Sequence, residues 1–178
     1  FFAEKGWKAE DMKIIVHAAA SLPAKQWPLE RFAAVMKKLQ QRYQARFIYT
    51  GSNDDARLYH EIERQGSFSG LNLCGVTSLR ENLSAYRAAN LFFGVDSGPM
   101  HMAAAVGVPV VALFGPTDER KWGPWGEGHM VISKRLACHP CKPHKCDDYK
   151  CMQQISVEEA LKAVEEKLAS ILMSFPRV

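Results

Sequence analysis

One short segment of the sequence carries the side chains best suited to binding a ligand. It lies between two apolar runs, 91–95 and 108–114, and reads Asp96-Ser97-Gly98-Pro99-Met100-His101. Ser97 is a residue type that begins helices, Gly98 allows close approach to the backbone, and Pro99 is tolerated in a first helical turn. Free N–H groups of such a turn, with the helix dipole, form a phosphate site. A simple cap made by Asp96 and Ser97 is the alternative interpretation.

Two further turns carry polar side chains in an equivalent place. Ser21 and Lys25 follow the apolar segment 13–17, and Asp55 follows the segment 46–50. A lysine places a point charge on a phosphate, and a carboxylate accepts hydrogen bonds from ribose or sugar hydroxyls. A solvent-exposed lysine and an acidic helix cap are the alternatives. His101 is likewise either a direct participant or an ordinary side chain at the rim of the site.

Four of the five cysteines fall in a loop at 138–151, at Cys138, Cys141, Cys146 and Cys151. A CxxC pair followed by two more thiols suits the tetrahedral coordination of a structural zinc, and His139 and His144 add potential ligands. Reduced thiols, or disulfides after oxidation, are the alternatives. No cofactor and no catalytic metal are expected.

Alternating strand and helix patterns must position these turns. Apolar runs predict strands over 13–17, 46–50, 71–74, 91–95 and 108–114, and apolar residues at helical spacing predict helices over 29–44, 54–64, 79–89 and 157–173. This alternation predicts an α/β fold, a Rossmann-like doubly wound parallel sheet. Such sheets bind ligands outside the carboxyl ends of their strands, where all three polar turns fall.

Composition excludes several classes of protein. The 178 residues are 47% hydrophobic and 24% charged, enough for one core, and the formal net charge is +4. No basic stripe interleaved with aromatics is present, so a nucleic-acid partner is not expected. No apolar run approaches the roughly 20 residues of a transmembrane segment, and the first residues lack the order of a signal peptide. We expect a soluble protein and, since the sequence starts without methionine, a piece of a larger one.

Four segments resemble a known family. LPAKQWPLERFA, TGSNDDARL, GVDSGPMHMAAAVGVPVVALFGPTD and CHPCKPHKCDDYKCMQQISVEEAL are similar to the carboxyl-terminal half of lipopolysaccharide heptosyltransferases, glycosyltransferase family 9. The resemblance implies that residues 1–178 are the nucleotide-sugar (donor) binding domain of a two-domain GT-B glycosyltransferase, with the amino-terminal acceptor domain absent from this chain. It also implies heptose transfer from ADP-heptose to a lipid-anchored inner core, at the inner face of the inner membrane.

The same resemblance implies roles for single residues. Lys25 matches a lysine near the donor phosphate and sugar, Ser21 a phosphate contact, Asp55 a nucleoside contact, Thr77 a neighbouring pocket position, and Asp96 a sugar contact, while Ser97, Gly98, Pro99, Met100 and His101 form the diphosphate cradle. The implied reaction is an inverting displacement whose base, an aspartate, belongs to the missing domain, so no catalytic residue is expected here. The chain departs from the pattern at Ala18-Ala19, where many relatives have Pro-Gly.

Two other functions remain open at this point. A degenerate transferase half would be a non-catalytic nucleotide or nucleotide-sugar binding domain with the same pocket. A serine hydrolase using Ser97 and His101 is disfavoured, because Gly94-Val95-Asp96-Ser97-Gly98 is not the GxSxG motif.

Overall fold

The computed structural model describes residues 2, 6–141, 146 and 148–174. The strands are β1 (Lys13–His17), β2 (Arg46–Tyr49), β3 (Leu71–Asn72), β4 (Leu91–Val95), β5 (Val110–Phe114) and β6 (Met130–Ser133). The α-helices are α1 (Leu29–Tyr43), α2 (Ala56–Gly66), α3 (Leu79–Arg87), α4 (Gly98–Ala105), α5 (Glu119–Trp122), α6 (Lys150–Gln153) and α7 (Val157–Ser174). Short 3-10 turns, η2 (Pro23–Lys25) and η3 (Asn53–Asp55), precede α1 and α2.

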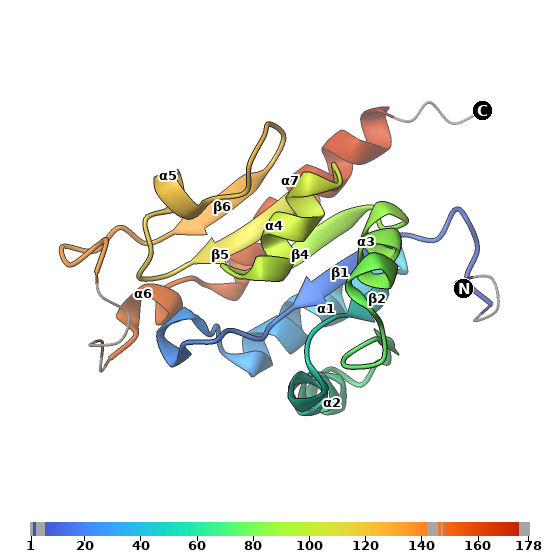
Figure 1. The fold of residues 1–178 in the computed structure, drawn as a ribbon, viewed down its shortest axis with the longest axis horizontal. Coiled ribbons are helices and arrows are strands. Elements are labelled where there is room, and N and C mark those ends of the chain that lie inside the picture. The colour runs from blue at the N-terminus through green and yellow to red at the C-terminus, as the bar shows by residue number, and fades with distance from the viewer. Residues whose placement is uncertain (1, 3–5, 142–145, 147, 175–178) are drawn as a thin grey trace.

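The six strands form one parallel sheet in the order β3-β2-β1-β4-β5-β6 (Figure 1). β1 lies at its centre between β2 and β4, with His17 opposite Gly94. The chain therefore reverses its direction of winding between β1 and β4, which is where doubly wound sheets open a ligand crevice. The predicted fold class is confirmed.

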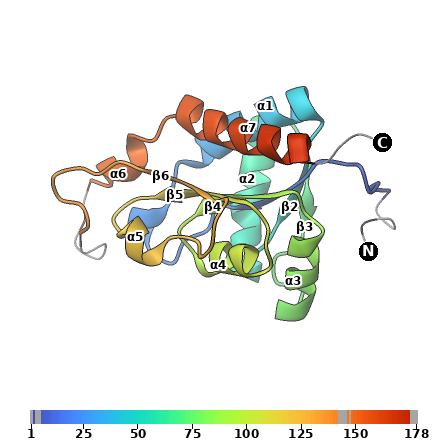
Figure 2. The same ribbon diagram turned by 90° about the horizontal axis from the view of Figure 1, so that it is seen from above.

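Helices cover both faces of the sheet. One face of the sheet carries Ile14, Val16 and Phe93 and packs against α1, α2 and α7. The neighbouring residues Ile15 and Phe92 lie on the other face and pack against α3 and α4. Figure 2 shows α1 and α7 on one side of the sheet and α3 and α4 on the other. Because both faces are buried, the strands are continuous apolar runs instead of alternating ones.

The elements missed by the sequence prediction are β6 and the two short helices α5 and α6. β6 is an edge strand of four half-buried or exposed residues, so it lacks the apolar run that marks the other strands. β5 starts at Val110 and not at Val108, because the Val108 N–H donates to the Ala103 carbonyl in the turn after α4. The predicted start of α7 is confirmed: Ser156 and Glu159 exchange hydrogen bonds of 2.9 and 3.2 Å.

Glycine at position 94 allows β1 and β4 to approach each other. A Cβ atom there would lie 2.5 Å from the carbonyl oxygen of His17 on the neighbouring strand. The carbonyl belongs to the backbone of a central strand and cannot move aside without disturbing the sheet. The contact lies one residue before the strand end that carries Asp96.

We expect Gly94→Ala to lower the free energy of unfolding by about 1–3 kcal/mol, because the added methyl overpacks the centre of the sheet. Urea denaturation of the purified protein measures this change. Gly98→Ala is the matched control, since a Cβ at that position meets no atom within 4 Å. Equal stability of the parent and Gly94→Ala would show that β1 and β4 do not need this close approach.

Candidate functional site

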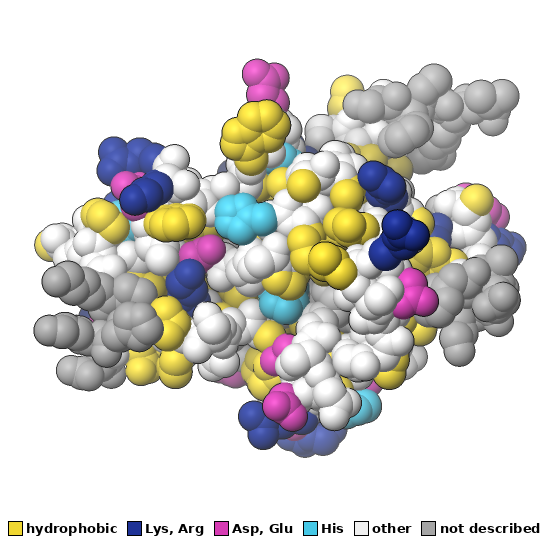
Figure 3. Space-filling view, in the orientation of Figure 1, with side chains coloured by type: hydrophobic (Ala, Val, Ile, Leu, Met, Phe, Trp, Pro, Cys, Tyr) yellow, Lys and Arg dark blue, Asp and Glu magenta, His cyan; other side chains and the backbone are white. Residues whose placement is uncertain are grey.

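A cleft of about 630 Å³ opens at the carboxyl ends of β1, β2 and β4. Its lining comes from the turns after these strands and from α3 and α4. The predicted residues that it brings together are Ser21, Lys25, Asp55, Asp96, Ser97, Gly98, Pro99 and His101. Around it, Figure 3 shows lysine and arginine side chains dispersed among acidic and apolar ones on one face of the molecule.

Lys25 and Asp96 form an ion pair inside this cleft. Lys25 Nζ lies 2.6 Å from Asp96 Oδ2, and the two side chains are 18% and 6% exposed. Lys25 ends the short turn η2, and Asp96 directly follows β4. Since removal from water strengthens the attraction between charges, this pair is stronger than an exposed one. The cleft therefore contains a cation that is already oriented.

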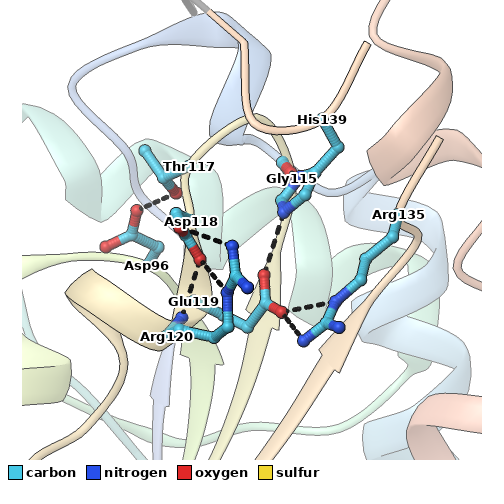
Figure 4. A network of polar contacts seen from close by, with 8 residues as sticks. All are labelled: Asp96, Gly115, Thr117, Asp118, Glu119, Arg120, Arg135 and His139. Carbon is cyan, nitrogen blue, oxygen red and sulfur yellow. Dashed lines mark hydrogen bonds and ion pairs between the residues drawn. The ribbon is translucent and has the colours of Figure 1, made fainter. Parts of the chain in front are cut away.

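Thr117 provides a second partner for Asp96. Its Oγ1 donates a hydrogen bond of 2.5 Å to Asp96 Oδ2, the same oxygen that Lys25 contacts (Figure 4). Thr117 lies in the turn after β5, beside the strand that carries Asp96. A buried carboxylate is costly unless it is paired and hydrogen-bonded, and these two contacts satisfy that need.

The beginning of α4 distinguishes a helix cap from an anion site. Ser97 occupies the N-cap position, but its hydroxyl donates to the Val95 carbonyl at 3.1 Å and does not cap the helix. Asp96 uses Oδ2 for Lys25 and Thr117. The cap interpretation is therefore wrong for these two side chains. Within the described residues, the N–H groups at the start of α4 remain suited to an anion.

Polar but uncharged groups form the floor of the cleft. His17 Nδ1 lies 2.8 Å from the Thr50 carbonyl, so Nδ1 carries the proton. Burial lowers the pKa of His17, and the ring is neutral at pH 7. Thr50 Oγ1 lies 2.8 Å from the Tyr86 hydroxyl, whose pKa burial raises to about 12. The floor offers hydrogen bonds without adding charge.

Asp55 and His101 lie at the rim of the cleft. Asp55 Oδ2 accepts hydrogen bonds from the Ser52 N–H at 2.7 Å and the Ser52 hydroxyl at 2.8 Å. The acidic-cap alternative therefore applies to this oxygen, although the half-buried side chain also faces the cleft. His101 is exposed on α4. It is a rim side chain that a ligand can reach.

Two predicted residues do not line the cleft. Met100 is fully buried against the sheet, so only its backbone could serve the predicted cradle. Thr77 lines a separate apolar cavity of about 310 Å³. Its Oγ1 lies 3.0 Å from both the Leu73 carbonyl oxygen and Asn82 Oδ1, and Asn82 does line the cleft. Thr77 could act on a cleft ligand only through Asn82.

Comparison with known proteins shows to which family the chain belongs. The family model described as glycosyltransferase family 9 (heptosyltransferase) matches residues 2–152. The chain belongs to glycosyltransferase family 9. This family 9 chain is 33% identical over 182 residues to lipopolysaccharide heptosyltransferase 3 of Escherichia coli, a match covering 94% of the chain and 52% of the relative. It thus spans about half the length of the curated relatives it matches.

Two solved structures have the same fold as the family 9 chain. A glycosyl transferase family 9 protein of Veillonella parvula matches with a TM-score of 0.82 and 26% identity, over 95% of this chain and 49% of the other. The Escherichia coli protein named ADP-heptose lps heptosyltransferase II matches with a TM-score of 0.76 and 26% identity, over 97% and 50%. The fit to one half of a GT-B enzyme is confirmed. Within the described residues, every helix is too short or too polar to cross a membrane.

The four predicted zinc ligands of the family 9 chain differ in their exposure. Cys138 is exposed, Cys141 and Cys146 are half-buried, and Cys151 is buried. In the described part of the chain, no three of their sulfur atoms lie within 4.8 Å of one another. Tetrahedral zinc holds thiolates about 3.8 Å apart. The predicted structural zinc stays a prediction that metal analysis tests; His144 lies outside the described residues.

Sequence reasoning missed several residues that line the cleft, as well as Thr117, which bonds to Asp96. His17 is the last residue of β1, and Thr50 directly follows β2. Their place at the carboxyl ends of parallel strands could have indicated that they face the cleft. Asn82 and Tyr86 reach the cleft from α3, and only tertiary packing brings them there. Thr117 stands in the segment FGPTD, where nothing local indicates its bond to Asp96.

The depressed pKa of His17 predicts a pH dependence of stability. Since the unfolded state binds a proton near pH 6.5 and the folded state resists it, stability falls as pH decreases through that value. We expect His17→Asn, whose amide still donates to Thr50, to reduce the loss between pH 7.5 and 5.5 by about 1 kcal/mol.

Urea denaturation at the two pH values measures the loss for parent and variant. His129, whose pKa burial also lowers, retains part of the dependence in both proteins. An identical loss in the parent and in His17→Asn would contradict the assignment to His17.

Proposed function

We propose that the cleft binds a nucleotide sugar such as ADP-heptose, and that residues 1–178 are the donor-binding half of an enzyme that transfers heptose to the lipopolysaccharide inner core. The supporting observation is the position of Lys25 beside Asp96 and the start of α4. A cation and helix-terminal N–H groups suit a diphosphate, and the carboxylate suits sugar hydroxyls. The similar Escherichia coli protein is named for ADP-heptose.

The proposed reaction is displacement at the anomeric carbon with inversion. The acceptor hydroxyl attacks that carbon while a base removes its proton, and the bond from carbon to the β-phosphate oxygen breaks. Negative charge then develops on the leaving ADP. Lys25 and the N–H groups at the start of α4 stabilise that charge, because they are oriented before the reaction begins. No metal is assigned to this step.

The remaining parts of the proposal concern the acceptor. We propose that the base and the binding site for a lipid-anchored core lie in the half of the relatives that this chain does not match. The reaction would take place at the cytoplasmic face of the inner membrane. A chain that binds ADP-heptose but transfers nothing even with that half supplied would instead be a non-catalytic binding domain.

The geometry of Ser97 argues against a hydrolase. Its hydroxyl donates to the carbonyl of Val95, two residues earlier, and His101 is exposed one helical turn away. An activated serine donates its proton to a histidine base. The serine hydrolase alternative therefore has no support from the arrangement of these two residues.

Removing Lys25 or Asp96 tests the proposed donor site. We expect Lys25→Ala to weaken ADP binding ten- to hundredfold, roughly the loss of a charge-assisted hydrogen bond. Asp96→Ala is expected to weaken ADP-heptose binding but to retain ADP binding, because Lys25 stays available for the phosphates. Titration calorimetry with each ligand measures both effects.

Lys162→Ala is the matched lysine control for these titrations. Lys162 is exposed on α7 and pairs with Glu166, so its loss is expected to leave both affinities unchanged. If Lys25→Ala and Asp96→Ala fold normally yet bind as tightly as the parent, the proposed site is wrong.

A methyl group at position 98 tests whether the ligand approaches the backbone of α4. A Cβ there meets open space on the cleft wall, so Gly98→Ala is expected to fold as the parent does. If the diphosphate sits against this turn, the methyl displaces it, and ADP affinity falls about tenfold or more. Unchanged affinity, measured by the same calorimetry, would place the phosphates elsewhere.

A further inference from the structure

Both described partners of the Asp96 carboxylate contact one of its two oxygens. Lys25 Nζ lies 2.6 Å and Thr117 Oγ1 2.5 Å from Oδ2. Neither contact uses Oδ1, and Figure 4 shows this second oxygen directed away from Thr117. Because two donors from different loops fix one oxygen, the rotation of the carboxylate is fixed as well. Oδ1 is the oxygen left to accept a hydrogen bond from a ligand.

The turn that carries Thr117 is hydrogen-bonded to residues that follow β6. His139 Nδ1 lies 3.2 Å from the carbonyl oxygen of Gly115, and the Cys141 N–H donates to the carbonyl of Pro116 at 2.9 Å. His139 Nε2 also lies 3.0 Å from Glu119 Oε2, at the far end of the turn (Figure 4). Contacts on both sides of Thr117 thus hold its backbone in place.

A bound diphosphate is expected to weaken the contact between Asp96 and Lys25 but not the contact between Asp96 and Thr117. An entering diphosphate competes with Asp96 for the Lys25 ammonium, because both are anions. Thr117 is not among the residues that line the cleft, so a ligand there does not compete for its hydroxyl. Thr117 therefore keeps its bond to Asp96 when Lys25 turns toward the phosphates, and the buried carboxylate retains a donor.

From these contacts we propose that Thr117 is a positioning residue for sugar recognition: it holds Asp96 Oδ2 so that Oδ1 meets a hydroxyl of the donor sugar. The inference rests on the proposed donor site and adds a residue to it. It predicts that Thr117 affects the sugar and not the nucleotide, since only Asp96 is oriented by it. A merely structural role for Thr117 would affect both ligands alike.

The test compares Thr117→Val, which keeps the shape of the side chain, with Thr117→Ser, which keeps the hydroxyl. Calorimetry with ADP-heptose and with ADP gives two affinities for each protein, and thermal unfolding checks that each variant is folded. We expect Thr117→Val to bind ADP-heptose about tenfold more weakly and ADP as the parent does. Thr117→Ser is expected to restore the parent ratio of the two affinities.

The outcomes separate this inference from the proposed function. If the parent binds neither ligand, the proposed donor site is wrong and the inference falls with it. If the parent binds both and Thr117→Val keeps the parent ratio, the donor site stands and Thr117 does not position Asp96. Equal loss of both ligands in Thr117→Val, or no rescue by Thr117→Ser, would also overturn the inference.

Discussion

The packing of β1 directly against β4 determines where the polar groups of the cleft lie. The chain leaves β1 toward α1 on one face of the sheet and leaves β4 toward α4 on the other, so a crevice opens between the two loops. Lys25 and Asp96, far apart in the sequence, meet there. Gly94 permits this, because a side chain on it would press against the His17 carbonyl. The site is a consequence of strand order.

The cleft contains two polar groups of different kinds, the Asp96 carboxylate and the N–H groups at the start of α4. The buried carboxylate of Asp96 is satisfied by residues of the chain itself, through Lys25 and Thr117. The N–H groups at the start of α4 receive no cap from Ser97 or Asp96, so their dipole is directed at whatever enters. Thus the carboxylate is satisfied before any ligand arrives, whereas the helix end stays suited to an anion. A preformed site of this kind loses little entropy on binding.

The sequence predicted the site where local rules apply. Lys25, Asp96 and Gly98 follow strands of a parallel sheet, and this position alone brings them to one edge. Met100 and His101 differ because one residue corresponds to about 100° around a helix, which turns the Met100 side chain to the sheet while His101 faces out. Thr117, Asn82 and Tyr86 depend on tertiary packing, and no nearby residue marks them. The edge strand β6 escaped prediction because its four half-buried or exposed residues form no apolar run.

The shared oxygen of Asp96 links three loops into one structural unit. Residues 25, 96 and 117 belong to the turns after β1, β4 and β5, and each contributes to a single point of contact. The effect of replacing one of them therefore depends on whether the other two are intact, so their substitutions are not additive. A change at any one of these three positions is therefore expected to be tolerated best when the other two change with it.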